Sequence, residues 1–223
     1  AAMDVVSWTA IPNQNLHGIA LADNLILTSP IFLEQAQELA DYHTELDGLT
    51  SVVVDVNEIY NEFSTGTPDP TGIRDFVRMV YRRSSGRLKY LTLFGRASAD
   101  FRNIMGYGQN FVPCYETFAD PHHELSFCAD DYYALMDNNE GSNCEGKVDI
   151  GVGRISVSTV EEAETVLRKI RHFNDLVASH GEWKNDIIFC ADDETLSYVE
   201  NTETLYRMLD TICPSLTAKK VYC

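Results

Sequence analysis

The chain has 223 residues, of which 44% are hydrophobic, and its formal net charge is −17 at pH 7. This length and apolar content suit one large domain or two small ones with a sizeable core. The acidic balance argues against nucleic-acid binding and against anionic membrane surfaces, because both rely on Lys and Arg. It permits cationic substrates or calcium, although most of these charges are expected to solvate the surface. No apolar run approaches the roughly 20 residues of a membrane span.

Strand and helix patterns alternate between residues 24 and 94. Residues 24–28 read as a short buried strand, and Ser29-Pro30 fits the cap and first position of a helix. A β-branched strand follows at 51–56, Asp69-Pro70 starts a second helix, and residues 88–94 form a third strand. This order predicts a parallel sheet flanked by helices, in which sites lie beyond the carboxyl ends of the strands. The expected apolar faces of the two helices are Phe32, Leu33, Ala36, Leu39, Ala40 and His43, and Ile73, Phe76, Val77, Val80 and Tyr81.

Residues 95–147 are irregular, aromatic and acidic, and a loop region of this length is usually functional. A buried strand is expected at 148–155, and a capping box at Thr159 and Glu162 starts a helix that runs to about Ser179. A strand at 186–191, a helix that leads to Pro214 and a strand at 219–223 complete the chain. Because it stops on a strand, we interpret the chain as a fragment. The apolar face of the 159–179 helix is expected to contain Val160, Ala163, Val166, Leu167, Ile170, Phe173 and Val177.

The six cysteines form no Cys-x-x-Cys pair, which argues against a zinc ribbon or a thioredoxin-type motif. Cys190 lies in an apolar strand, where a small core residue is expected. Cys114, Cys128 and Cys144 lie in the loop-rich middle of the chain. A disulfide among these three is open in an oxidising compartment, but its pairing cannot be read from sequence.

Several sequence blocks resemble the gingipain-like cysteine peptidases, and most of all the PorU branch, the sortases of the type IX secretion system. The leading block is Asn57-Glu58-Ile59-Tyr60-Asn61-Glu62-Phe63-Ser64, followed by Gly66 to Thr71 and Ile73 to Phe76. The blocks occur in the family's order and cover nearly the whole chain. The other blocks are Gln14-Asn15-Leu16-His17-Gly18, Leu93-Phe94-Gly95, Asp130-Asp131-Tyr132, Asp137-Asn138-Asn139-Glu140-Gly141, Asp149-Ile150-Gly151-Val152-Gly153-Arg154 and Ala191-Asp192-Asp193.

The resemblance implies a caspase-like α/β fold in two subdomains. Residues 1–147 would be the amino-terminal subdomain, with the 95–147 loop region, and residues 148–223 the incomplete start of the catalytic subdomain. It also implies an exported protein at the outer membrane or cell surface, which cleaves carboxy-terminal sorting signals from exported polypeptides. The implied partners are the polypeptide substrate, the remainder of the peptidase domain and other secretion-system components.

The resemblance also implies a catalytic Cys-His pair that this chain lacks. The family's histidine lies in a His-Gly block after the strand that begins near Val221, and its cysteine lies further on. His17-Gly18 precedes the first strand and does not take that role. A pair built from His122 or His123 with Cys114 or Cys128 has no supporting motif, so loop histidines and structural cysteines are the favoured interpretation. The 223 residues alone are therefore predicted to be inactive.

Acidic residues after the 186–191 strand are the best-placed candidates for chemistry. Asp192, Asp193 and Glu194 follow a buried strand at the end where α/β sites form. By resemblance, Asp193 or Glu194 would support the catalytic histidine, and which of the two does so stays open. An equally weighted alternative is a solvated loop that caps the next helix. Glu200 and Glu203 are candidates for a pocket that binds a basic substrate residue.

A second acidic group offers oxygen ligands suited to calcium, although its spacing does not match an EF-hand. The candidate ligands are Asp130, Asp131, Asp137 and Glu140, with Asn138 beside them. Gingipains are calcium-stabilised, so the resemblance favours calcium somewhere in 95–147. The alternative is a set of Asx-type turns at a tyrosine-lined junction between subdomains.

Three functional hypotheses follow from the sequence. The first is a fragment of a gingipain-like cysteine endopeptidase or sortase. The second is a non-catalytic surface module that keeps the same fold for binding or assembly. The third, a flavodoxin-type ligand-binding domain, ranks last because no Gly-rich phosphate loop joins a strand to a helix.

Overall fold

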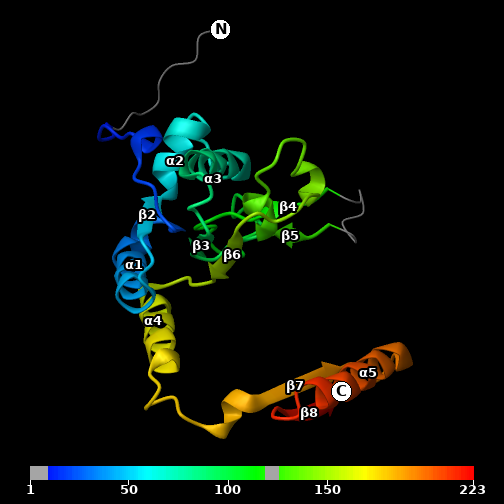
Figure 1. The fold of residues 1–223 in the computed structure, drawn as a ribbon. Helices are drawn as coiled ribbons and strands as arrows, with labels where there is room; N and C mark the ends of the chain where they lie inside the picture. Colours follow the sequence, from blue (N-terminus) through cyan, green and yellow to red (C-terminus); the bar gives the residue numbers. More distant parts are fainter. Residues whose placement is uncertain (1–9, 119–125) are drawn as a thin grey trace. The chain divides into compact units, whose positions relative to one another are not determined.

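The computed structural model describes residues 10–118 and 126–223, which form two compact units. The first unit ends at Leu167 and the second is Arg168–Cys223. Figure 1 shows the order of the elements along the chain. Within the described residues, no helix combines the length and the apolar character that crossing a bilayer requires.

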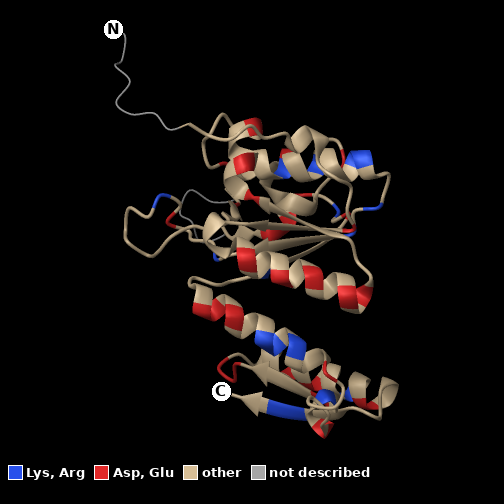
Figure 2. Ribbon diagram, turned by 90° about the vertical axis from the view of Figure 1, so that its left-hand side faces the viewer, with Lys and Arg blue, Asp and Glu red and all other residues tan. Residues whose placement is uncertain are grey.

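A four-stranded parallel sheet organises the first unit, as the sequence predicts. Its order is β2-β1-β3-β6, and the strands are β1 (Asn24–Thr28), β2 (Ser51–Asp55), β3 (Tyr90–Phe94) and β6 (Gly151–Ile155). Leu25 pairs with Val52 on one side and with Leu91 on the other, and Leu91 pairs with Val152. The main helices are α1 (Leu33–Asp47), α2 (Val56–Phe63) and α3 (Pro70–Ser84). Figure 2 shows helices on both faces of the sheet.

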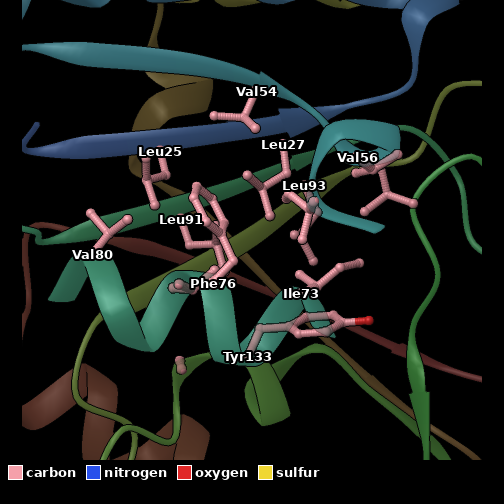
Figure 3. Packing of buried hydrophobic residues seen from close by; sticks show 14 of the residues in the cluster. Leu25, Leu27, Val54, Val56, Ile73, Phe76, Val80, Leu91, Leu93 and Tyr133 are labelled. Carbon is pink, nitrogen blue, oxygen red and sulfur yellow. The ribbon is translucent and has the colours of Figure 1, made fainter. Parts of the chain in front are cut away.

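The core lies between this sheet and α3 (Figure 3). Leu25, Leu27, Leu91 and Leu93 alternate along their strands and point to one face, where they are at most 1% exposed. They meet Ile73, Phe76, Val77 and Val80, four of the five residues of the predicted apolar face of α3, and each of the four is fully buried. The fifth, Tyr81, is half-buried and packs against this core. The cap prediction is also confirmed, because the Asp69 carboxylate accepts a hydrogen bond from the Thr71 N–H at 2.8 Å.

Two helix predictions differ from the structure. The β-branched pattern predicts a strand that reaches residue 56 and gives no sign of α2. This helix begins directly after the strand, because the Asp55 side chain accepts a hydrogen bond from the Asn57 N–H at 2.9 Å. The helix predicted to reach Ser179 is α4 (Val160–Asn174), which ends earlier. The Asp175 carboxylate accepts from the N–H groups of Val177 and Ala178, and this turn stops the helix. Val177, expected to face inward, is 88% exposed.

The remaining elements are short or belong to the second unit. Between β3 and β6 lie β4 (Tyr115–Glu116), β5 (Cys128–Ala129) and the 3₁₀ turns η3 (Asp130–Ala134) and η4 (Ser142–Cys144). Further turns are η1 (Leu16–Gly18), η2 (Pro30–Phe32) and η5 (Glu182–Asn185). The second unit contains a parallel pair, β7 (Asp186–Ala191) and β8 (Thr217–Tyr222), and α5 (Leu196–Ile212).

The boundary expected after residue 147 does not coincide with the division into compact units. β6 follows that boundary, yet it pairs with β3 along its whole length and so completes the first sheet. The division lies within α4, between Leu167 and Arg168. That residues 148–223 begin a catalytic subdomain stays a prediction.

Glu62 of α2 fastens the amino-terminal segment to the first unit. Its carboxylate accepts from the Leu16 N–H at 2.7 Å and from Gln14 Nε2 at 3.0 Å, and it contacts His17 Nδ1 at 2.8 Å. Burial alone would raise the pKa of Glu62, but these hydrogen bonds outweigh it and hold the pKa at about 2. The segment around Leu16 is therefore held by an ionised carboxylate.

We expect Glu62→Gln to lower the free energy of unfolding at pH 7 by roughly 2 kcal/mol. This is less than the full pKa shift of Glu62 would give, because the contact with the exposed His17 ring is screened by solvent. The folded pKa lies below the ordinary value of 4.5. The contribution is therefore complete above pH 4.5 and fades as the pH falls toward 2. Urea unfolding between pH 3 and 7 measures the difference in free energy of unfolding between wild type and variant. This difference should become smaller below pH 4.5. Glu45→Gln, at an exposed position of α1, is the control, and a gap independent of pH would contradict the prediction.

Candidate functional site

A buried arginine organises the carboxyl end of the first sheet. Arg154 of β6 has a side chain that is 11% exposed, and its Nε and Nη2 each lie 2.7 Å from a carboxylate oxygen of Asp130. Its Nη1 donates to the carbonyl oxygens of Gly95 at 2.7 Å and Val112 at 2.6 Å, and Nη2 also donates to that of Pro113 at 3.2 Å. One side chain thus fixes three parts of the long loop region to the sheet.

Arginines of α3 hold the 135–140 segment in the same way. Arg74, which is 7% exposed, donates to the Leu135 carbonyl through Nε and Nη2 and to the Glu140 carbonyl at 3.0 Å. One turn further along, Arg78 donates to the carbonyls of Met136 and Asp137. The Asn138 side-chain oxygen accepts from Arg78 at 2.7 Å and from Arg82 at 2.8 Å. Guanidinium groups therefore hold this run through its backbone carbonyls and the Asn138 amide oxygen.

The four predicted calcium ligands do not form one ligand set. Asp130 is engaged by Arg154, and the two oxygens of Glu140 accept from the N–H groups of Asp137 and Lys147. Across residues 10–118 and 126–223, no three His, Cys, Asp or Glu side chains converge on a point that could hold a metal ion. Asp130, Asp131, Asp137 and Glu140 as placed here do not fit a calcium ion, and we derive no chemistry from one. Calcium binding by the chain stays an expectation from the resemblance.

Gly141 allows the buried guanidinium of Arg74 to reach the loop. Its φ is +88°, and a β carbon added there would lie 2.8 Å from Arg74 Cζ. The Arg74 side chain cannot move away without losing contacts, because it donates to two carbonyls and its Cζ lies 5.2 Å from the Tyr132 ring centroid. This close approach, together with the left-handed backbone, explains why the acidic run ends in glycine.

We expect Gly141→Ala to lower the free energy of unfolding by about 2–3 kcal/mol, the sum of backbone strain and lost Arg74 hydrogen bonds. Gly48→Ala is the matched control, since Gly48 has φ +68° with nothing within 4 Å of an added β carbon. It should cost only the strain, about 1 kcal/mol. Chemical unfolding of both variants separates the two contributions. Equal losses would mean that Arg74 moves without cost.

A small cavity lies next to Arg154. Its volume is about 260 Å³, and its lining includes Cys114, Cys128, Asp130 and Arg154. A larger cavity, about 670 Å³, lies at the other end of the same sheet, where the strands begin at Asn24, Tyr90 and Gly151. Sites in parallel sheets form at the carboxyl ends of strands, so the smaller cavity has the expected position and the larger one does not.

In the second unit, the acidic triplet follows β7 directly, where the sequence analysis places it. The Asp193 N–H donates to the Cys223 carbonyl, and the Cys223 N–H to that of Ala191, so the triplet lies beside the end of β8. The Asp192 carboxylate accepts from the Glu194 N–H at 2.8 Å and forms the turn. The carboxylates of Asp193 and Glu194 are exposed, and within the described residues no hydrogen bond or ion pair occupies them. Of the three acids, these two are free to act on another group.

The two glutamates proposed for substrate binding differ in their surroundings. Both belong to α5. Glu203 Oε1 lies 2.8 Å from Lys220 Nζ and 2.7 Å from the Tyr222 hydroxyl, and these contacts lower the pKa of Glu203. Its carboxylate therefore joins α5 to β8. Glu200 is exposed and has no such side-chain partner within the described residues. A role for either residue in a substrate pocket stays a prediction.

The thiols and imidazoles of the described residues do not form a catalytic pair. His17 pairs with Glu62 and His43 with Asp47, and no hydrogen bond joins a described cysteine to a described histidine. His122 and His123 lie outside the described residues. Within residues 10–118 and 126–223, no hydrogen-bonded thiol–imidazole pair accompanies the strand-end acids.

Comparison with known proteins decides the family. The model of Peptidase family C25 matches residues 20–223. The chain belongs to this family. The match includes the four-stranded sheet, the β7–β8 pair, the arginine-held loop region and the acidic triplet, and it leaves out residues 1–19.

Solved structures agree with this assignment. The structure of dimeric latent PorU from Porphyromonas gingivalis matches with 31% identity and a TM-score of 0.65, over 78% of the C25 chain and 17% of that chain. The Arg-specific cysteine proteinase gingipain R (RgpB) shares the fold, with 15% identity and a TM-score of 0.67 over 95% of the C25 chain and 43% of its own. The gingipain-like fold predicted from sequence is therefore confirmed.

A curated relative of undescribed function, an uncharacterized protein of Archaeoglobus fulgidus, is 27% identical over 175 residues. This alignment covers 76% of the C25 chain and 37% of the archaeal protein. The chain thus spans well under half the length of each of these relatives.

Sequence reasoning missed the two arginines that shape the loop region. Arg154 appeared only as the end of a family block, and Arg74 only as part of another. A signal for Arg154 was present, because a single charged residue in an otherwise apolar strand must find a partner when it is buried. In α3, the i, i+4 spacing of Arg74, Arg78 and Arg82 shows that they share one helix face. The sequence does not show which backbone carbonyls this face contacts.

Proposed function

We propose that this chain is part of a cysteine-type endopeptidase that cleaves carboxy-terminal sorting signals from exported proteins at the outer membrane or cell surface. The observation that carries the proposal is the C25 family match over residues 20–223. The 31% identity to PorU supports the sortase role, and the fold shared with an Arg-specific cysteine proteinase supports the peptidase chemistry. Other components of the secretion machinery are its proposed partners.

In this proposal the catalytic cysteine and histidine are not among residues 1–223. In the parent protein, a thiolate would attack the peptide carbonyl, a histidine would transfer the proton, and backbone N–H groups would stabilise the oxyanion. Transfer of the acyl group to an amine instead of water would make the same enzyme a sortase. Residues 1–223 would contribute the scaffold and, through Asp193 and Glu194, an acidic wall that positions the histidine.

The test compares the parent protein with the 223-residue chain. The substrate is a reporter protein fused to a carboxy-terminal sorting signal, with an otherwise identical fusion that carries a scrambled signal as control. We expect the parent to cleave only the first fusion and to lose this activity after thiol alkylation, while the chain alone cleaves neither. Alkylation-sensitive cleavage by the chain alone would place the nucleophile within it. If the parent cleaves neither fusion and reacts with no active-site thiol probe, the non-catalytic binding module is the better description.

A further inference from the structure

Two cysteine thiols share the cavity beside Arg154. Cys114 and Cys128 both line its 260 Å³, with Ser98 and Ser156 nearby. Cys114 precedes β4 and is 8% exposed, whereas Cys128 is the first residue of β5 and is exposed. The cavity therefore holds one thiol shielded by the fold and one that reagents in solution can reach.

The pairing of β4 with β5 explains why these thiols meet. Glu116 lies opposite Cys128, and Tyr115 opposite Ala129. Side chains alternate along a strand, so Cys114 is on the same face as Glu116 and diagonal to Cys128. Burial, and then the neighbouring Cys128 thiol, raise the pKa of Cys114 to about 12. On its other side, Cys128 Sγ lies 3.9 Å from Glu116 Oε1.

We propose that Cys114 and Cys128 are a redox pair, which a small-molecule disulfide such as oxidised glutathione converts into a disulfide at the base of the β4–β5 hairpin. The exposed Cys128 loses its proton and attacks one sulfur of the oxidant, which releases one glutathione thiolate. Because burial disfavours its thiolate, Cys114 reacts in a slower second step. It loses its proton to water and attacks the Cys128 sulfur, which forms the protein disulfide and releases the second glutathione. Two protein thiols are oxidised, and one disulfide is reduced to two thiols.

The short ladder makes this closure feasible. Diagonal neighbours on paired strands lie about 7–8 Å apart at their Cα atoms, slightly beyond the usual span of a disulfide. Because β4 and β5 pair over only two residues each, the strand end at Cys114 can move toward Cys128 without disrupting a longer ladder. Cys144 packs against the hydrophobic core instead of lining this cavity, so it does not compete for either thiol.

Peptide mapping of the full chain tests the proposal. Trypsin is unsuitable, because no Lys or Arg lies between Arg102 and Lys147, and all three cysteines would share one peptide. Cleavage after glutamate separates them, because Glu116, Glu124 and Glu140 lie between the thiols. After equilibration with oxidised glutathione, we expect a cross-link between the peptide that ends at Glu116 and the peptide 125–140. It should reverse on reduction.

Two variants make the result decisive. Cys144→Ala removes the third thiol of the region and should keep the cross-link, whereas Cys128→Ser removes an exposed thiol and should abolish it. The oxidised wild type should also melt at a higher temperature than the reduced protein, with no such shift in Cys128→Ser. A bond to Cys144, or a Cys114 that remains fully alkylatable in denaturant after oxidation, would overturn the proposal.

Discussion

Replacing Arg154 with methionine is expected to lower the free energy of unfolding by about 2–4 kcal/mol. This is somewhat less than the usual cost of removing one partner from a fully buried ion pair, because the Asp130 side chain is 25% exposed. Methionine keeps much of the side-chain volume but cannot donate hydrogen bonds. The Asp130 carboxylate would then lose both of its 2.7 Å contacts, and the carbonyls of Gly95, Val112 and Pro113 would lose their donor. Most of the loss should come from these stranded polar groups.

Urea unfolding of three proteins tests this account of Arg154. Arg82→Met is the matched control, because Arg82 is exposed and, among the described residues, donates to Asn138 alone, so its loss should cost less than about 1 kcal/mol. In the double variant Asp130→Asn/Arg154→Met, neutralising the carboxylate should recover about 1–2 kcal/mol of the single-variant loss. If Arg154→Met behaves like Arg82→Met, the guanidinium does not hold the loop region to the sheet.

The parallel sheet could be predicted because its determinants are local. Each strand of the four-stranded sheet lies in a short, mostly apolar or β-branched run, and helix starts such as Asp69-Pro70 carry their own cap. The missed helix α2 shows the limit of this reasoning. Its apolar residues Val56, Ile59 and Tyr60 have helical spacing. The helix follows β2 without a loop, so no Gly or Pro marks where the strand pattern ends and the helix pattern begins.

The loop region could not be predicted for a different reason. An acidic run attracts a cation, and sequence alone does not say whether that cation is a metal ion or an arginine from elsewhere in the chain. For the run 137–141, a metal ion and an arginine are both physically reasonable partners. Only the packing of α3 against the loop shows that Arg74, Arg78 and Arg82 approach it.

The acidic triplet Asp192, Asp193 and Glu194 could be predicted only in part. Its position after a strand followed from the pattern of residues 186–191, and the structure ends β7 at Ala191. The expected burial of this strand is wrong for the described unit, because no residue of β7 is buried and Cys190, expected in the core, is exposed. One hydrogen bond distinguishes the three acids. The Asp192 carboxylate accepts it and forms the turn, whereas the carboxylates of Asp193 and Glu194 have no hydrogen-bond partner among the described residues. That distinction gives a sharp prediction for the parent enzyme.

If Asp193 or Glu194 positions the catalytic histidine of the parent, neutralising that residue should lower kcat about 100-fold with little change in KM. Asp193→Asn and Glu194→Gln test the two acids separately, because one positioning carboxylate is sufficient. Asp192→Asn is the control within the triplet, since an asparagine can still accept the Glu194 N–H and keep the turn. Asp210→Asn, an exposed change on α5, is the control outside it.

A second measurement separates positioning from simple damage to the fold. A carboxylate that stabilises the protonated histidine also favours the cysteine thiolate, which is the form that iodoacetamide alkylates. The variant that loses kcat should therefore also react more slowly with iodoacetamide in the absence of substrate, while its free energy of unfolding changes by less than about 1 kcal/mol. Rescue by the carboxylate swap Asp193→Glu or Glu194→Asp would support a role for the charge itself. If neither acid changes kcat or the alkylation rate, the triplet only shapes the turn between β7 and α5.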